Sequence, residues 1–353
     1  MPEELQGSTL ARYLLLVYAL LVVYASLHPF SGWTALGVDP FAFLTAPPPR
    51  YVLRLDIVAN ILGYAPLGFL AVLAAYPRWR GVKAVAAAGA AAVVMSFMFE
   101  ALQSYLPSRD PSNFDFAANS AGGISGALLA AFVSDKLLGP HGLKALRHRV
   151  FRPGPRVDLG LVLLGLWLFS QMDPQTLLFG AGDLRVLFQE PAAQLHPADV
   201  FVRAEALVVG ANAAAVGLLA ALLGVPAKHP RAFFAAIIAV ALAVHAAAYA
   251  VYFGADGALN WLTPGAYIGV GTGVLVILAA STLPRPAQFV LCALAIMTAA
   301  VVVNIAPANP YLAESLSTWR QGYFEHFIGL TRVVSAAWPF VALVYIVSFA
   351  SSR

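Results

Sequence analysis

The chain consists of successive apolar blocks, each roughly 17 to 24 residues long, separated by short stretches rich in proline, glycine and charge. A helical block of about 20 residues, rising 1.5 Å per residue, matches the roughly 30 Å hydrocarbon core of a bilayer. Of the 353 residues, 60% are hydrophobic and only 11% are charged, whereas soluble domains have about 25% charged residues. The pattern excludes a soluble enzyme and a single-span receptor.

The boundaries of the apolar blocks predict an all-α, polytopic integral membrane helical bundle with about ten transmembrane helices. The expected spans are 10–27, 54–76, 82–106, 116–133, 157–172, 204–225, 232–253, 265–283, 287–306 and 333–350. The first span follows an acidic start and has no small-residue cleavage site, so we interpret it as a retained helix. Cys292 is the only cysteine, which excludes an intramolecular disulfide.

The charges predict the orientation of the chain in the membrane. With the N-terminus inside, the inner segments hold 14 of the 21 Lys and Arg residues, so the positive-inside rule predicts that both termini are cytoplasmic. Acidic residues show the reverse pattern, since 13 of the 17 lie at or beyond the predicted outer surface. This second asymmetry indicates that the functional chemistry lies on the outer side.

The segment 135–156 carries six basic residues and one acidic residue between the fourth and fifth spans. Its lack of interleaved aromatic residues argues against nucleic-acid binding, and we expect it to contact anionic lipid at about 1 kcal/mol per basic residue. Three regions are therefore predicted: a four-helix membrane domain at 1–135, a basic cytoplasmic linker at 136–156, and a six-helix membrane domain with outer interfacial loops at 157–353.

Acidic and carboxamide residues, which are costly inside a membrane, recur in pairs along three of the first four spans. The pairs, each about one helical turn apart, are Asp56 and Asn60, Glu100 and Gln103, and Asp115 and Asn119. At 1.5 Å per residue, one member of each pair lies about 5 to 9 Å below the outer end of its helix, and the other lies just above. The lower tier is Asn60, Glu100 and Asn119, and the upper tier is Asp56, Gln103 and Asp115. Arg109 lies in the loop above them, and His28 ends the first span.

Each of these groups has a chemical use. A carboxylate in such a place can act as a general acid or base, and Asp56, Glu100 and Asp115 together can hold Mg²⁺ or Ca²⁺, which would polarise a phosphate ester. Arg109 suits bidentate contact with a lipid phosphate. We predict that Asp56, Glu100, Asp115 and Arg109 are catalytic, and that Asn60, Gln103, Asn119 and His28 bind substrate. The alternative is a closed hydrogen-bond network that only fastens the helix ends.

The second half has few charges within its spans. We interpret Asn212, His245 and Asn304 as interhelical hydrogen-bond partners, and Gly265, Gly269 and Gly273 as a close-packing face. The outer loops of this half mix acidic, basic and aromatic residues: Asp173, Asp183, Glu190, Asp199, Glu314, Trp319, Arg320, Tyr323, Phe324, Glu325 and Arg332. They predict either an interfacial segment that covers the first-half site or a solvated loop with an aromatic belt.

The motifs SLHPF, DIVANILGYAPLGF and FEALQSYLPSRDPSNFDFAANSAGGISG resemble the VanZ-like family of bacterial membrane proteins, over roughly residues 10–135. The family's polar positions map to Asp56, Asn60, Glu100, Gln103, Arg109, Asp115 and Asn119. The resemblance implies a multi-pass protein of the bacterial inner (cytoplasmic) membrane that serves the cell envelope, because the founding member is associated with low-level resistance to teicoplanin, a lipid-bearing glycopeptide.

The leading hypothesis is an outer-leaflet site that acts on or binds a lipid headgroup, a lipid-linked saccharide or a lipoglycopeptide, in its enzymatic form a metal-assisted headgroup hydrolase or transferase. A non-catalytic amphiphile binder or an envelope-organising scaffold is the alternative. Transport is disfavoured because the acids gather at one surface and paired broken helices are absent from the sequence pattern. The expected partners are membrane lipids or lipid-linked envelope precursors, not nucleic acid.

Overall fold

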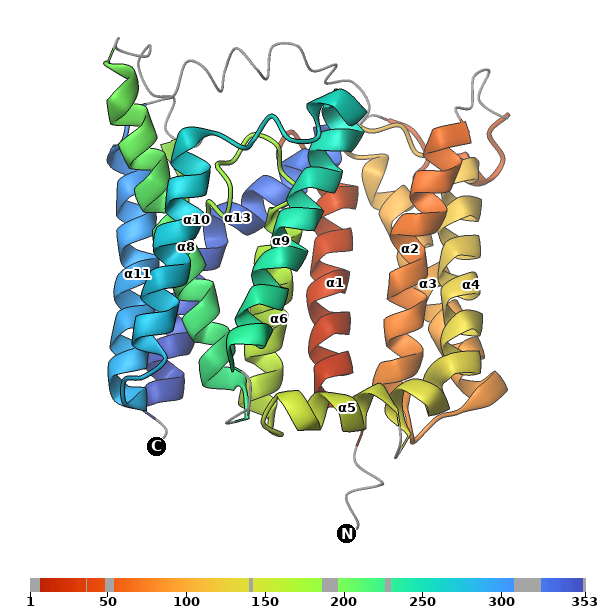
Figure 1. The fold of residues 1–353 in the computed structure, drawn as a ribbon. Coiled ribbons are helices and arrows are strands. Elements are labelled where there is room, and N and C mark those ends of the chain that lie inside the picture. Colours follow the sequence, from red (N-terminus) through yellow and green to blue (C-terminus); the bar gives the residue numbers. More distant parts are fainter. Residues whose placement is uncertain are drawn as a thin grey trace. The chain divides into compact units, whose positions relative to one another are not determined.

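The computed structural model describes residues 7–35, 37–47, 54–139, 142–185, 196–225, 230–307 and 325–351 (Figure 1). Within these ranges the regular structure is helical, apart from an isolated bridge between Phe151 and Gly224. The chain divides into two compact units, Met1–Arg149 and Val150–Arg353. The division falls inside the predicted basic linker.

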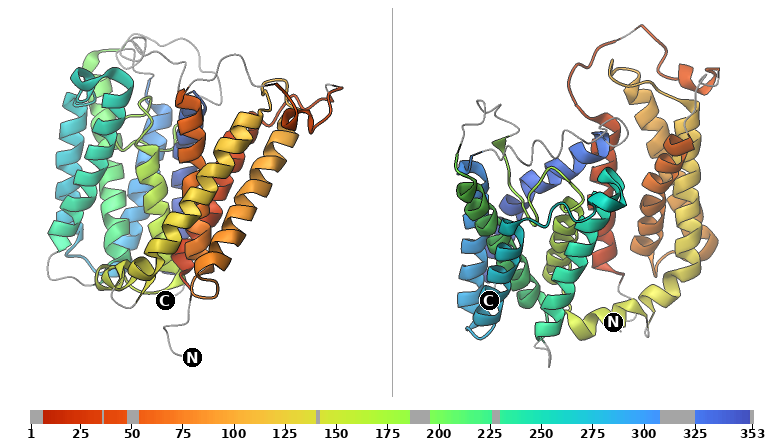
Figure 2. Two further views of the ribbon diagram at one scale, coloured as in Figure 1. Left: turned by 90° about the vertical axis from the view of Figure 1, so that its right-hand side faces the viewer. Right: turned by 45° about the horizontal axis from the view of Figure 1, so that its top comes forward.

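The described residues of the first unit form four long helices and two short ones. These are α1 (Thr9–Leu27), η2 (Ala42–Leu44), α2 (Arg54–Ala75), α3 (Gly81–Gln103), α4 (Asn113–Leu138) and α5 (Leu143–Val150). Helices α2, α3 and α4 lie side by side (Figure 2), and α2 makes its most extensive contact with α4. The short helix α5 was not predicted, because its eight residues are too polar to register as an apolar block.

Glycines allow the close approach of α2 and α4. A Cβ added at Gly126 would overlap the Ala65 carbonyl, and one added at Gly122 would overlap the Ile61 carbonyl. Across the same interface, a Cβ at Gly68 would overlap the carbonyl of Gly123. Backbone-to-backbone contact of this kind brings the polar ends of both helices together.

Helix α2 continues through Pro66, which lacks the N–H needed for the helical bond to residue 62. One turn earlier, the Tyr18 hydroxyl of α1 donates a 2.8 Å hydrogen bond to the Gly63 carbonyl. A side chain from a neighbouring helix therefore bonds a backbone carbonyl close to the proline.

The second unit is built around one buried helix. Its elements are α6 (Pro155–Ser170), α8 (Ala198–Leu223), α9 (Pro230–Phe253), η3 (Ala255–Gly257), α10 (Pro264–Ala280), α11 (Arg285–Ile305) and α13 (Glu325–Ala350). The apolar stretch of α8 is 78% buried, and its largest contacts are with α10 and α11. As predicted, Gly269 and Gly273 of α10 pack closely, against Val209 and Ala213 of α8.

Each of the ten expected spans corresponds to a helix, which confirms a polytopic helical membrane fold. Among the described residues, eight helices are long and apolar enough to cross a membrane: α1, α2, α3, α4, α8, α9, α11 and α13. Helix α10 has 17 residues and α6 has 16, lengths of about 26 and 24 Å that fall below the roughly 30 Å core. The total of ten spans and the cytoplasmic location of both termini stay predictions.

Two helices begin earlier than the apolar pattern predicted. Helix α8 starts at Ala198, not 204, and α13 starts at Glu325, not 333, so Asp199 and Arg332 lie in helices, not in loops. A hydropathy pattern ends at charged residues, whereas a helix continues through them when they pair, as Asp199 and Arg203 do at i,i+4 spacing. Glu190, Glu314, Trp319, Arg320, Tyr323 and Phe324 lie outside the described residues.

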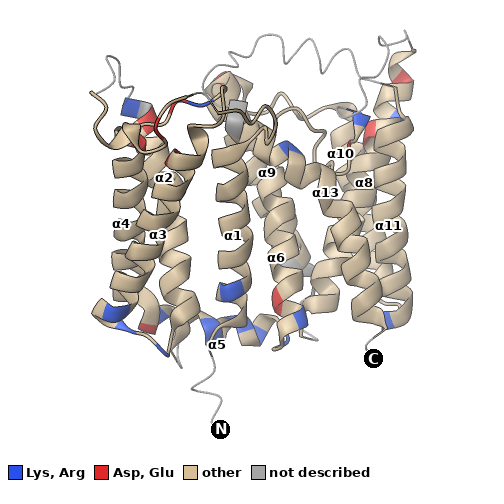
Figure 3. Cartoon of the chain, turned by 180° about the vertical axis from the view of Figure 1, so that it is seen from behind, with Lys and Arg blue, Asp and Glu red and all other residues tan. Residues whose placement is uncertain are grey.

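Charges in the first unit separate toward its two ends. Basic residues gather at the end that carries α5 and the start of α1, and most acidic residues lie at the opposite end (Figure 3). The exception is Asp135, which accepts a 2.9 Å hydrogen bond from the Tyr76 hydroxyl, while the Arg80 guanidinium lies 4.5 Å from the centre of the Tyr76 ring. The polar residues predicted as a site therefore share the acidic end.

Candidate functional site

Glu100 lies at the junction of α3 and α4, with only 2% of its surface exposed. Its Oε2 accepts a 2.8 Å hydrogen bond from the backbone nitrogen of Ser112. Ser112 is the N-cap of α4, and its Oγ accepts a 3.1 Å bond from the backbone nitrogen of Phe114. The carboxylate therefore accepts a hydrogen bond at the N-terminal end of α4, where the helix leaves backbone N–H groups without intrahelical partners.

Asp115, in the first turn of α4, is held by α2. The Asn60 side chain donates a 2.6 Å hydrogen bond from Nδ2 to Asp115 Oδ1. Asp56, in the first turn of α2, is exposed and interacts electrostatically with Asp115, and Asp115 in turn interacts with Glu100. The three predicted carboxylates therefore lie near one another, with exposure increasing from Glu100 through Asp115 to Asp56.

Arg109 and Gln103 bind the end of α1. Arg109 donates from Nη2 to the carbonyls of Ala25 (2.8 Å) and His28 (3.1 Å), and from Nε to His28 (3.3 Å). Gln103 donates from Nε2 to the Ser26 carbonyl at 2.9 Å. These bonds satisfy carbonyls that a helix end leaves without intrahelical partners.

The charge of Arg109 remains available to the site. Burial lowers the pKa of its guanidinium, while the nearby Glu100 carboxylate raises it. An arginine in a protein nevertheless stays protonated. The backbone carbonyl of His28 accepts the bonds from Arg109, and the His28 ring lies 5.0 Å from that of Tyr24. Substrate binding by His28 stays a prediction.

Four further polar side-chain atoms of α2, α3 and α4 are buried in the first unit. Tyr64 Oη, Ser96 Oγ, Asn119 Oδ1 and Ser120 Oγ are buried and make no hydrogen bond of good geometry among the described residues. The Tyr64 hydroxyl is nevertheless close enough to the Ser26 and Ser96 side chains to interact with them. Tyr64 interacts electrostatically with Glu100. Buried polar atoms of this kind are normally paired, so these four mark an incomplete network.

Sequence reasoning missed Tyr64 and Ser96, although a local signal was present. Tyr64 lies one turn beyond Asn60 on α2, and Ser96 lies one turn before Glu100 on α3. Extending the i,i+4 pairs by one more turn finds both residues.

The segment Phe41–Ala46 packs beside the site within the first unit. The ring of Phe43, which is buried, lies 5.9 Å from the ring of Phe97 on α3 and 6.1 Å from that of Phe116 on α4. The Asn113 side chain donates a 2.8 Å hydrogen bond to the Ala46 carbonyl. This segment was not predicted as part of the site, because its contacts come from residues more than 50 positions away.

The predicted cation site gains no support from the geometry. Across the part of the chain that the structure describes, no three His, Cys, Asp or Glu side chains are grouped so that they could hold a metal ion. Binding of Mg²⁺ or Ca²⁺ by Asp56, Glu100 and Asp115 therefore stays a prediction.

The polar residues of the second unit differ in part from their interpretation. Asn212 donates to the Val208 carbonyl of its own helix at 3.1 Å, so its interhelical role was wrong. A buried amide on a helix can satisfy itself one turn back without a neighbour. His245 Nδ1 bonds the Gln171 carbonyl at 2.8 Å, and Asn304 bonds the Gly182 carbonyl at 2.6 Å. Both therefore join separate elements of the unit.

Comparison with known proteins links the first unit to one family. No curated protein and no solved structure matches the chain. Residues 10–134 match the family model described as VanZ/LLP1, a range that starts in α1, ends in α4 and includes all eight predicted site residues. Residues 10–134 are thus similar to the VanZ/LLP1 family, and further helices follow the matched range.

Proposed function

We propose that the polar end of α2, α3 and α4 binds the headgroup of a lipid or lipid-linked envelope precursor at the outer leaflet of the bacterial cytoplasmic membrane. The observation that supports this proposal is the incomplete network around Glu100. A network that only fastened helices would satisfy its own members, because an unpaired buried polar group costs about 1–3 kcal/mol. Tyr64, Ser96 and Asn119 instead offer hydrogen-bonding atoms to a ligand.

In the catalytic form of this proposal, Glu100 is the general base or acid. It is the most buried of the three carboxylates, and its bond to Ser112 fixes its position. Asp115, oriented by Asn60, is the second carboxylate, and exposed Asp56 lies at the mouth of the site. The reaction class is hydrolysis or transfer of a headgroup.

Arg109 has the charge to attract a phosphate. Because Nε and Nη2 are bonded to α1 carbonyls, only Nη1 is left for a direct contact, and the bidentate clamp predicted from the sequence is replaced by a single hydrogen bond plus charge.

A non-catalytic amphiphile binder is the second candidate. Asn60, Gln103 and Arg109 are already engaged with protein groups, so a ligand would meet a fixed frame with few groups free to move protons. A lipoglycopeptide or a lipid-linked saccharide has the hydroxyls and amides that suit such a frame.

The test uses the purified full chain in nanodiscs that contain phosphatidylglycerol and phosphatidylethanolamine, with and without Mg²⁺ or Ca²⁺. Mass spectrometry follows headgroup release or exchange for the wild type, Glu100→Gln and Asp115→Asn, with Asp110→Asn as a matched exposed-acid control. Turnover that the two site variants abolish supports catalysis. Saturable lipid binding without turnover supports the binder, and neither turnover nor binding contradicts both candidates.

A further inference from the structure

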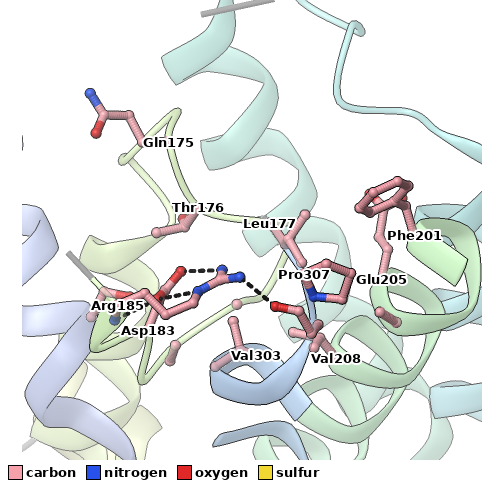
Figure 4. A pocket seen from close by; sticks show the side chains of 15 residues that line it. Gln175, Thr176, Leu177, Asp183, Arg185, Phe201, Glu205, Val208, Val303 and Pro307 are labelled. Carbon is pink, nitrogen blue, oxygen red and sulfur yellow. Dashed lines mark hydrogen bonds and ion pairs between the residues drawn. The ribbon is translucent and has the colours of Figure 1, made fainter. Parts of the chain in front are cut away.

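The second unit contains a pocket that the proposed function does not use. It encloses about 600 Å³ of empty space including its open mouth. Its walls come from the segment that follows α6, the first turns of α8, the end of α11 and one turn of α13 (Figure 4). The apolar lining includes Leu177, Phe201, Val208, Val303 and Pro307, and the polar lining is Gln175, Thr176, Asp183, Arg185, Glu205 and Ser335.

One wall of the pocket is held in place before any ligand binds. Asn304 of α11 donates to the Gly182 carbonyl at 2.6 Å and accepts from the Leu184 nitrogen at 2.9 Å. The Gly182 nitrogen donates to the Ser335 carbonyl of α13 at 2.8 Å. A preformed wall reduces the ordering that a ligand must impose.

The single arginine in the lining is already neutralised. Arg185 donates to Asp183 from Nε at 3.0 Å and from Nη2 at 2.6 Å, and its Nη1 donates to the Ala306 carbonyl at 2.9 Å (Figure 4). All three guanidinium nitrogens are therefore bonded within the wall. An anionic ligand would find no uncommitted cation there.

The charge that remains is negative. Glu205 is 7% exposed, and no Lys, Arg or His of the described ranges lies within ion-pair distance of it. Asp173 and Arg332 do not line the pocket, and they attract each other. The lining thus carries one excess negative charge at a buried position, where a hydrogen bond with the Thr263 side chain offsets only part of the cost of burial.

A second unsatisfied group lines the same pocket. Ser335 is 2% exposed, and within the described residues its hydroxyl has no hydrogen-bond partner. Among the described residues, the Glu205 carboxylate has no cation beside it, and the buried Ser335 hydroxyl has no hydrogen-bond partner. Together they favour a positively charged ligand group with several hydrogen-bond donors. The apolar lining beside them favours a ligand with a hydrocarbon chain.

We propose that this pocket binds an amphipathic amine. The ammonium group lies beside Glu205 and Ser335, the alkyl part packs against Val208 and Val303, and the ring of Phe201 adds a cation–π contact. A neutral glycoside would leave the Glu205 charge uncompensated, and a carboxylate would repel it.

Three ligands with the same chain test the charge requirement: hexylamine, hexanol and hexanoate, titrated calorimetrically into the purified full chain in nanodiscs at pH 7.5. We expect hexylamine to bind at least tenfold more tightly than the other two. Equal binding of hexanol or hexanoate overturns the proposal without any variant.

Variants then locate the binding. Glu205→Gln lowers hexylamine affinity about tenfold or more, and Phe201→Ala lowers it several-fold. Asp199→Asn, an exposed acid on the same helix that pairs with Arg203, leaves it unchanged. Equal loss in Asp199→Asn and Glu205→Gln, or no loss in Glu205→Gln, places the amine elsewhere and overturns the assignment.

Discussion

The Glu100 carboxylate accepts a hydrogen bond from the backbone nitrogen of Ser112 at 2.8 Å, so an acid at the end of α3 positions the first residue of the α4 cap. This bond couples the structure of the α3–α4 junction to the most buried acid of the candidate site.

We expect Glu100→Gln and Glu100→Ala to separate these two roles. Glutamine keeps an oxygen for Ser112 but loses the charge, so headgroup turnover falls about 10²-fold or more while the thermal stability changes little. Alanine leaves the Ser112 nitrogen unpaired and lowers stability by about 1–3 kcal/mol. Turnover assays and thermal unfolding in detergent measure both. Turnover in Glu100→Gln equal to that of Asp110→Asn would contradict a catalytic Glu100.

Helix packing predicts opposite outcomes for two glycines of the α2–α4 pair. A Cβ at Gly126 overlaps the Ala65 carbonyl, so Gly126→Ala forces the helices apart and costs about 1–3 kcal/mol. A Cβ at Gly63 meets nothing within 4 Å, so Gly63→Ala is neutral or stabilising by up to about 1 kcal/mol. Thermal unfolding of both variants tests this, and an equal change of stability in the two would show that the contact with Ala65 does not set the cost.

Arg109→Ala should release the end of α1. The substitution removes three hydrogen bonds to the Ala25 and His28 carbonyls, and bonds from a charged donor contribute about 1.5–3 kcal/mol. We expect faster hydrogen exchange in Tyr24–His28, measured by mass spectrometry. Arg54→Ala, at the exposed start of α2, is the control, and unchanged exchange in Arg109→Ala would refute the tether.

The second unit should become less stable as pH rises through about 6. Burial raises the pKa of Asp173 from 3.8 to about 6, with the Gln175 backbone and Arg332 acting against this shift. The folded chain holds the Asp173 proton more tightly than the unfolded chain does, and this difference contributes to stability. The contribution is fully present below pH 3.8 and is lost as pH rises through 6, by about 3 kcal/mol in all.

Asp173→Asn tests the assignment, because an amide does not titrate. We expect the difference between the melting temperatures at pH 5 and pH 7.5 to shrink in Asp173→Asn and to persist in Asp256→Asn, an exposed acid of η3. A pH dependence that survives in Asp173→Asn assigns it to another group.

Much of the fold could be predicted because its signals are local. An apolar block and its proline or glycine boundary need only neighbouring residues, and the resulting helices match the expected spans. The same holds for the pairs Asp56 and Asn60, Glu100 and Gln103, and Asp115 and Asn119, since helical spacing alone puts their members on shared faces.

The partners of these residues depend on contacts between distant segments. Arg109 bonds a carbonyl 84 positions away, and Gln103 bonds one 77 positions away. From the sequence alone, a charged side chain could equally well bind a phosphate, a metal ion or the end of a helix. Only the packed structure shows that Arg109 and Gln103 bond backbone carbonyls at the end of α1.

The sequence by itself thus determined that this chain is a multi-span helical membrane protein with an acidic end in its first four helices, because hydrophobicity and helical period act over a few turns. The tertiary structure decided which polar atoms are already bonded and which are left open. Tyr64, Ser96 and Ser335 became recognisable as unpartnered groups only when helices far apart in sequence enclosed them, because burial is a property of the packed chain.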